Sequence, residues 1–364
     1  MEVNYLIVGA GLTGLTFANL LAQNENKKIL IVEKRQHIGG NVYDSYNASN
    51  ILIHNYGPHI FHTNNREVWN YLSQFTKWRD YQHRVLTFVD GLFVPMPITL
   101  ETINQIYNIN LSQFEMVDFI ERQRVKVKQI ISSEDVALSN AGRDIYEKFF
   151  MNYTIKQWGV PPSELDPTVI SRIPLRFNRD TRYFTDHYQG IPKAGYTKMC
   201  EQMIDRHNIK LMLNTDYKEV KDEIHCDKMI YTGPIDYFYD NQFGKLKYRS
   251  IRFEMEDYDC ESFQDAAVVN YPNDYDFTRI TEYKKITGQQ QLKTTVMKEF
   301  PCDGEEPFYP FPTKDWQERY LMYKTKADAE ENVIFAGRLA EYRYYNMDVV
   351  VARAMGVFES MSFK

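Results

Sequence analysis

Three glycines near the N-terminus have the spacing of a dinucleotide-binding turn. Gly9, Gly11 and Gly14 form a Gly-x-Gly-x-x-Gly pattern, and the acidic Glu33 follows at about the separation that such sites use. Glycines at these positions allow a tight turn and let a pyrophosphate approach the N-terminus of a helix closely. A carboxylate at Glu33 can accept hydrogen bonds from ribose hydroxyls and would repel a 2′-phosphate. The pattern therefore predicts a dinucleotide site that disfavours an NADP-type ligand.

The segments around this turn supply the structural context that the pattern requires. Residues 4–8 predict a buried parallel strand, the glycine turn opens a helix that runs to about Gln23, and residues 28–32 predict the next strand. The glycine pattern alone is weak, but a complete βαβ unit around it makes a turn without a ligand improbable. We therefore expect an α/β chain with a Rossmann-like nucleotide-binding domain.

Two distant segments favour FAD over NAD as the ligand. The run Gly39-Gly40-Asn41 resembles an extended flavoprotein pattern in which a second glycine pair approaches the cofactor. Residues 333–338 resemble the strand that returns beneath the flavin in the same superfamily. The sequence has no second glycine pattern followed by an acid, which argues against a separate NAD(P)H domain.

The remaining chain divides into a helical and a β-rich part. Residues 101–158 have a largely helical pattern, with many charges on the exposed face of 120–136 and an amphipathic helix over 144–153. From about Asp227 onward, short β-rich runs alternate with turn residues, as expected for an antiparallel sheet. These runs cover 229–232, 246–253, 267–270, 278–283 and 294–300; a separate strand is expected over 333–335, and a final helix begins near Asn346.

The composition excludes several classes of protein. Of the 364 residues, 43% are hydrophobic and 25% charged, so no long disordered stretch is expected. The formal net charge of −6 does not fit a nucleic-acid binder. No segment is apolar for long enough to predict a membrane span. The four cysteines lack a CxxC pair, which argues against a metal site and is typical of reduced thiols in the cytoplasm.

Several further segments resemble the UDP-galactopyranose mutases of the bacterial type, an FAD-dependent family. The resemblance runs nearly end to end, and the ordered set is far more specific than any one motif. The segments are 53–63, 153–159, 172–177, 188–192 with 195–198, 231–236, 248–250 and 337–345.

This resemblance implies a three-part molecule and a non-redox use of the flavin. It implies an FAD domain over 1–75, 190–240 and 325–364, a helical domain over 100–160, and an antiparallel sheet domain over 76–99, 161–189 and 241–324. The implied reaction interconverts UDP-galactopyranose and UDP-galactofuranose through a covalent adduct between N5 of reduced FAD and the anomeric carbon of the sugar. We also expect a homodimer.

The resemblance also assigns roles to individual residues. Arg172 and Arg279 match arginines that bind the departing diphosphate, for which a guanidinium gives bidentate, charge-assisted hydrogen bonds. With His62, which matches a position beside the flavin, they form the expected catalytic set. Trp158 matches a tryptophan on a mobile loop that closes over the substrate. The expected cofactor-binding residues are Gly9, Gly11, Gly14, Glu33, Gly40, Asn41, His59, Arg338 and Met347, and the expected substrate-binding residues are Tyr153, Trp158, Arg172, Tyr183, Arg279, Tyr309, Tyr344 and Asn346.

One departure from the family pattern leaves the sugar open. Many relatives have Asp where this chain has Asn346, which keeps hydrogen-bonding capacity but loses the negative charge. Related enzymes act on UDP-N-acetylgalactosamine or dTDP-fucose, so these sugars are alternatives to UDP-galactose. An FAD-dependent oxidase or desaturase would share the glycine turn but would not need the paired arginines and tyrosines. A flavin-binding protein without catalysis is a third interpretation.

Overall fold

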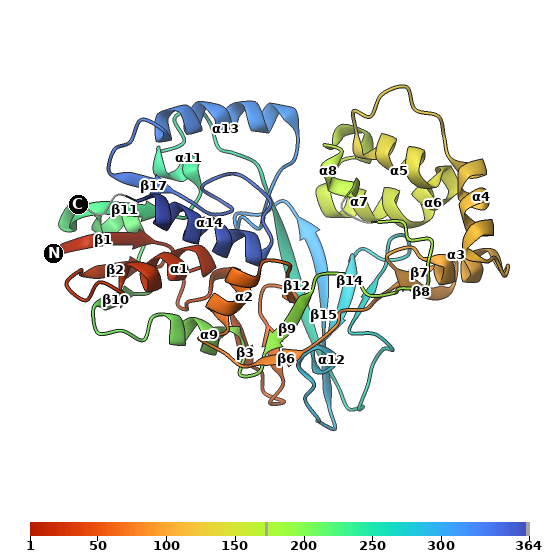
Figure 1. Ribbon diagram of the computed structural model, residues 1–364, viewed down its shortest axis with the longest axis horizontal. Coiled ribbons are helices and arrows are strands. Elements are labelled where there is room, and N and C mark those ends of the chain that lie inside the picture. Colours follow the sequence, from red (N-terminus) through yellow and green to blue (C-terminus); the bar gives the residue numbers. More distant parts are fainter. Residues whose placement is uncertain (172–173, 362–364) are drawn as a thin grey trace.

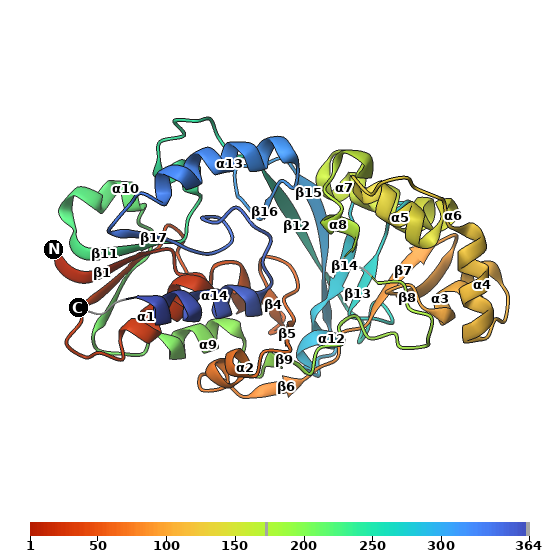
Figure 2. The same ribbon diagram turned by 45° about the horizontal axis from the view of Figure 1, so that its top comes forward.

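A computed structural model describes residues 1–171 and 174–361 of the chain. The molecule is elongated, and a long mixed sheet lies in its middle (Figure 1). A parallel sheet with both chain ends lies on one side of it. A group of helices, α3 to α8, lies on the other side, and the turned view shows the same arrangement (Figure 2).

The part of the molecule that holds both chain ends is built on a five-stranded parallel sheet with the order β10-β2-β1-β11-β17. Successive side chains of β1 and β2 alternate between the two faces of the sheet. Ile7 and Ile31 pack into the core on one face, and Leu6 and Leu30 pack into the core on the other. Burial on both faces is what a near-continuous apolar strand sequence predicts. The strands are β1 (Glu2–Val8), β2 (Ile29–Val32), β10 (Ile209–Met212), β11 (His225–Tyr231) and β17 (Val333–Phe335).

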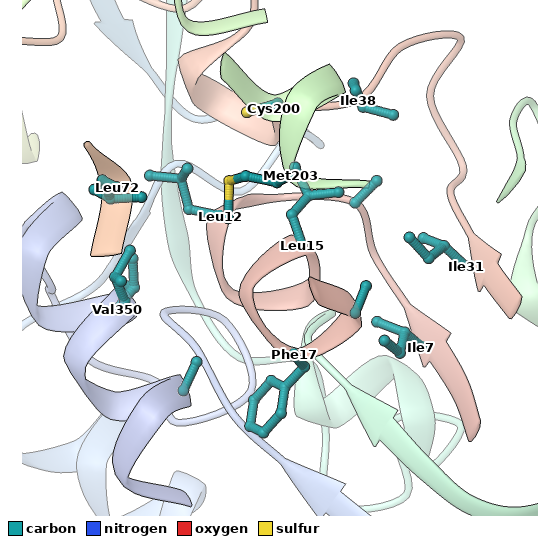
Figure 3. Packing of buried hydrophobic residues seen from close by; sticks show 14 of the residues in the cluster. Ile7, Leu12, Leu15, Phe17, Ile31, Ile38, Leu72, Cys200, Met203 and Val350 are labelled. Atoms are coloured by element: carbon teal, nitrogen blue, oxygen red, sulfur yellow. The ribbon is translucent and has the colours of Figure 1, made fainter. Parts of the chain in front are cut away.

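Helices cover both faces of this sheet, so the predicted Rossmann-like arrangement is confirmed. On one face, α1 (Leu12–Leu21) packs against α14 (Met347–Ser360) and α9 (Tyr196–Met203). Figure 3 shows Leu15 of α1 with Met203 of α9 above it. The other face carries α10 (Tyr217–Val220) and α11 (Ile235–Phe238), and α13 (Lys314–Ala327) packs against α11.

The central sheet has seven strands in the order β16-β12-β15-β14-β13-β7-β8. All neighbouring pairs are antiparallel, as predicted, except the parallel pair β13 and β7. The strands are β16 (Tyr309–Pro310), β12 (Tyr248–Tyr258), β15 (Thr294–Cys302), β14 (Arg279–Glu282), β13 (Val268–Asn270), β7 (Val85–Val89) and β8 (Leu92–Met96), with α12 (Tyr283–Thr287) after β14.

Two small sheets connect the parallel sheet to the central one. Asp44 fixes one of them to α9, because its carboxylate accepts hydrogen bonds from the backbone N–H groups of Tyr196 and Thr197 at 2.6 and 2.8 Å. The three-stranded sheet has the order β5-β9-β6, and the hairpin pairs β3 with β4. Their elements are β3 (Asp44–Tyr46), β4 (Leu52–His54), β5 (Phe61–Thr63), α2 (Arg66–Leu72), β6 (Trp78–Asp80) and β9 (Tyr188–Pro192).

The helical part differs from the prediction in two places. Residues 124–132 are a loop, because the capping box of Ser132 and Asp135 starts a new helix after the charged stretch. Within 144–153, the chain is helical as predicted, but Tyr146–Met151 forms a π-helix. The helices are α3 (Leu100–Tyr107), α4 (Gln113–Gln123), α5 (Ser133–Ala141), α6 (Arg143–Ile145), α7 (Asn152–Trp158) and α8 (Thr168–Ser171). The domain boundaries given above stay a prediction.

We expect two glycine-to-alanine substitutions to have opposite effects on stability. A Cβ at Gly14 would lie 2.0 Å from the carbonyl oxygen of Gly9, so Gly14→Ala must lift α1 off the turn and should cost about 1–3 kcal/mol of unfolding free energy. Gly356 lies inside α14 with nothing within 4 Å, so Gly356→Ala should stabilise by roughly 0.4–1 kcal/mol. Urea unfolding would check both, and equal stabilities would contradict the packing described here.

Candidate functional site

The glycine turn presents the N-terminus of α1 as a site for an anion. Gly9 has a φ of 102° and donates its N–H to the carbonyl of Val32 at 2.8 Å. Gly11 is the N-cap of α1, and no side chain in the described ranges caps this end. The first N–H groups of a helix have no partner within it, so they can bind the phosphates of a dinucleotide.

Three segments that are far apart in the sequence meet at this turn. Gly11 forms a bridge with Gly39, and a Cβ at Gly40 would lie 2.9 Å from the Cα of Gly11. Gly337, with a φ of 99°, lies so close to α1 that a Cβ there would be 2.9 Å from Oγ1 of Thr13. Side chains at these glycines would force the segments apart. The fold thus brings together the glycines that the sequence predicts for one cofactor.

Glu33 lies at the carboxyl end of β2, where a ribose is expected. Its side chain is buried, and its two carboxylate oxygens accept hydrogen bonds from the backbone N–H of Ala10 at 2.7 Å and of Arg35 at 2.8 Å. Asn41 accepts a hydrogen bond from Nη1 of Arg35 at 3.0 Å, and Arg35 also pairs with Glu306. These bonds fix Glu33 and Asn41 on one side of the glycine turn. The polar groups fit the adenosine half of FAD.

Two histidines predicted to lie beside the flavin have different surroundings. His59 bonds through Nδ1 with the carbonyl of Gly57 at 2.8 Å. Burial, with a contribution from His54, lowers the pKa of His59 to about 3, so this ring is neutral at physiological pH. His62 pairs through Nδ1 with Asp186 at 2.9 Å and stacks on Phe184 with ring centroids 3.6 Å apart. Both rings are therefore held in fixed orientations.

Arg338 lies against two stacked tyrosine rings, those of Tyr309 and Tyr344. Its Nη2 donates to the carbonyl of Tyr345 at 2.7 Å, and its guanidinium lies 5.6 and 5.4 Å from the rings of Tyr309 and Tyr344. Those two rings stack on each other with centroids 5.5 Å apart. Burial raises the pKa of Tyr309 to about 12, with Tyr344 adding to the effect, so its hydroxyl stays a hydrogen-bond donor.

Asn346 and Met347 begin the last helix, α14, directly after Tyr344 and Tyr345 in the sequence. Asn346 is the exposed N-cap of α14, and its side chain makes no capping hydrogen bond with a described residue. Met347 is the first residue of the helix and is half-buried. The Asn346 amide is thus not used to cap its own helix, which leaves it available for another hydrogen-bonding partner.

Arg279 lies opposite a buried carboxylate on the neighbouring strand. Arg279 of β14 and Glu299 of β15 are direct cross-strand partners, and Nε of Arg279 is 3.1 Å from Oε2 of Glu299, which is 2% exposed. Burial alone would lower the pKa of Arg279, but Glu299 and the hydroxyls of Tyr153, Tyr309 and Tyr183 outweigh it and raise the pKa. The guanidinium stays charged within reach of all three tyrosines.

The remaining predicted residues have three different outcomes. Tyr153 lies on α7 and Tyr183 on the loop before β9, and both are half-buried and close enough to act on the charge of Arg279. Trp158 is the last residue of α7 and is buried against Phe311. Phe311 and Leu165 pack around its ring, and the closing movement expected of the segment that carries Trp158 stays a prediction. Arg172 lies outside the described residues.

The sequence interpretation missed two buried residues of this site. Glu299 is buried in β15, but it follows Lys298 in a strand that begins with two threonines, so the sequence held no clear signal of a buried ion pair. His83 is buried, and the burial, with the charges of Arg279 and His62, lowers its pKa to about 3. Its Nδ1 bonds with the hydroxyl of Tyr81 at 3.1 Å, and its ring packs against Tyr183.

Comparisons with known proteins identify the family. The family model for UDP-galactopyranose mutase matches residues 148–344, and a model for NAD(P)-binding Rossmann-like domains matches residues 7–75. A Klebsiella pneumoniae protein described as a probable UDP-galactopyranose mutase is 39% identical over 97% of this chain and 93% of its own length. The chain belongs to the UDP-galactopyranose mutase family. It is thus a mutase, one of the isomerases, and its family implies a nucleotide-sugar substrate and a flavin.

Two further relatives bear on substrate and fold. An Escherichia coli dTDP-fucopyranose mutase is 38% identical over 96% of both chains. A crystal structure of reduced UDP-galactopyranose mutase matches with a TM-score of 0.77 at 17% identity, and covers 99% of this chain and 96% of that one. This second likeness shows the fold. Among residues 1–171 and 174–361, no helix has the length and apolar character needed to cross a bilayer.

We expect Arg279→Lys to weaken UDP binding at least tenfold, which corresponds to about 1.4 kcal/mol. A lysine keeps the charge but cannot form the fork that contacts both Glu299 and a phosphate. Isothermal titration calorimetry with UDP would measure the change. Arg143→Lys is the matched control, because Arg143 is 63% exposed and pairs with Glu147 on the helix surface. Unchanged affinity in Arg279→Lys would exclude Arg279 from the diphosphate site.

Proposed function

We propose that the protein interconverts UDP-galactopyranose and UDP-galactofuranose with reduced FAD as its cofactor. The observation that carries this proposal is the charged Arg279, whose side chain is 26% exposed, pairs with the buried Glu299 and interacts electrostatically with Tyr153, Tyr183 and Tyr309. A diphosphate that departs and returns needs fixed positive charge and hydroxyl donors at one place. An oxidase acting on a small uncharged substrate has no need of this set.

The residues of the site divide into two groups. Gly9, Gly11 and the free end of α1 would hold the pyrophosphate of FAD, and Glu33 its ribose. His59, His62 and Arg338 would lie around the flavin ring, where the fixed hydrogen bonds of His59 and His62 keep both rings from rotating. When bound in its reduced form, FAD supplies a nucleophilic nitrogen for the anomeric carbon of the sugar.

The second group would bind the nucleotide sugar. Arg279 would neutralise charge on the diphosphate as it leaves the sugar, and Tyr309 and Tyr344 would donate hydrogen bonds to it. Tyr153 would stack on the base from α7, with Trp158 at the other end of that helix. Arg172 would supply a second guanidinium, a role that rests on the sequence resemblance alone.

A second candidate substrate is dTDP-fucopyranose. The Escherichia coli relative with that name is 38% identical to this chain, almost the same as the 39% of the Klebsiella protein. Asn346 carries no charge where many family members have an acid, so the sugar side of the cleft is less negative than in those members. The same chemistry on this sugar, or on UDP-N-acetylgalactosamine, would use the same arginine and tyrosines.

Turnover with a panel of nucleotide sugars tests the proposal. Dithionite-reduced protein should convert UDP-galactofuranose into UDP-galactopyranose over many cycles without further reductant, because the flavin returns unchanged. Oxidised protein should be inactive, since its flavin lacks a nucleophilic nitrogen. Chromatography would follow the conversion, with dTDP-fucopyranose and UDP-N-acetylgalactosamine as parallel arms. One reducing equivalent spent per product would instead establish a redox enzyme.

We also propose that the protein works as a cytoplasmic homodimer. The four free thiols support a reducing compartment. Phe114, which is 86% exposed, and Val117 lie one turn apart on the outer side of α4, and a second copy could cover both. Light scattering should therefore give twice the mass of one chain for the wild type. Phe114→Glu should shift the mass toward one chain, whereas a wild-type monomer would contradict the dimer.

A further inference from the structure

Arg249 of β12 reaches the end of the helix that carries two of the proposed substrate residues. Its side chain is 5% exposed. Nε donates to the carbonyl of Gln157 at 2.9 Å, and a terminal nitrogen, Nη2, donates to the carbonyl of Lys156 at 3.2 Å. The last carbonyls of a helix have no partner within it and carry the negative end of the helix dipole. The guanidinium therefore caps the C-terminus of α7.

The turn that leaves α7 closes over the same guanidinium. Gly159 is the C-cap, has a φ of 74°, and donates its N–H to the carbonyl of Ile155 at 2.7 Å. A Cβ at Gly159 would lie 3.4 Å from Nη1 of Arg249. Nη1 also pairs with Asp303 at 2.5 Å, but the side chain of Asp303 is 73% exposed. Arg249 is thus enclosed by the helix end, and its carboxylate partner lies at the surface.

Other contacts fix the side of α7 that faces the central sheet. Nζ of Lys156 donates to the carbonyl of Tyr271 at 2.7 Å, and Nδ2 of Asn152 donates to Asn273 at 3.1 Å. These bonds hold α7 against the loop that follows β13. Among the described residues, Arg249 is the side chain that binds the carbonyls of Lys156 and Gln157 at the helix end, where Trp158 and the turn at Gly159 are placed. In Figures 1 and 2, α7 lies beside the strands of the central sheet.

We propose that Arg249 is a positioning residue for nucleotide-sugar binding, which acts by capping α7 and fixing the helix that carries Tyr153 and Trp158. The proposal rests on the proposed function, in which those two aromatic residues contact the substrate. A lysine cannot replace Arg249. One ammonium group cannot donate to two successive carbonyls and a carboxylate with the geometry of a planar fork.

The test compares UDP affinity and kinetics in Arg249→Lys with those of the wild type. In protein that retains FAD, the variant should bind UDP at least tenfold more weakly and show a raised KM, with kcat at saturation changed less than threefold. A purely structural role would lower the melting temperature and FAD content but leave the KM of the folded fraction unchanged. Gly159→Ala disturbs the same contact from the helix side and should change KM in the same direction.

Two matched variants isolate the helix cap. Asp303→Asn removes only the exposed counter-ion, and Arg252→Lys alters an exposed arginine on the same strand, so both should bind UDP like the wild type. Wild-type affinity in both Arg249→Lys and Gly159→Ala would overturn the proposal while leaving the proposed function intact. A wild-type protein that binds no UDP would instead overturn the proposed function, and the positioning role with it.

Discussion

The pair of Arg279 and the buried Glu299 is the constraint on which the site depends. Glu299 is 2% exposed, and a carboxylate buried to that extent needs a cation beside it, because an unpaired buried charge is costly. Arg279 supplies that cation as the direct cross-strand partner of Glu299 in the register of β14 and β15. A one-residue slip of either strand would turn one of the two side chains to the opposite face of the sheet. The register of the central sheet therefore determines whether Arg279 and Glu299 can pair.

The same sheet also connects the two ends of the molecule. Arg249 and Ser250 are neighbours on β12. Arg249 binds α7 and the loop after β15, and Ser250 binds the same loop three residues further along. Arg249 holds the end of α7 and pairs with Asp303, whereas Ser250 donates to the backbone carbonyl of Glu306. Glu306 in turn pairs with Arg35, which donates to Asn41 beside the glycine turn. A short acidic loop thus links the helix that carries Tyr153 to the predicted cofactor side of the protein.

The sequence predicted local features well and non-local ones poorly. The glycine turn and Glu33 were predictable because a βαβ unit places them within one short segment. The partnership of Glu299 with Arg279 was not, because it depends on strand register across twenty residues of separation (299 minus 279). The burial of Trp158 beside Phe311 was not predictable either, because it depends on a segment far along the chain. A motif match can assign a residue type but cannot supply its packing partners.

The protonation state of three histidines decides which groups supply positive charge at the proposed site. Burial lowers the pKa values of His54, His59 and His83 to about 3, so all three rings are uncharged at neutral pH. The positive charge near the proposed diphosphate site then comes from arginines, which do not titrate in this range. The contribution of these arginines to the attraction for an anionic diphosphate should accordingly stay constant as the pH varies around neutrality.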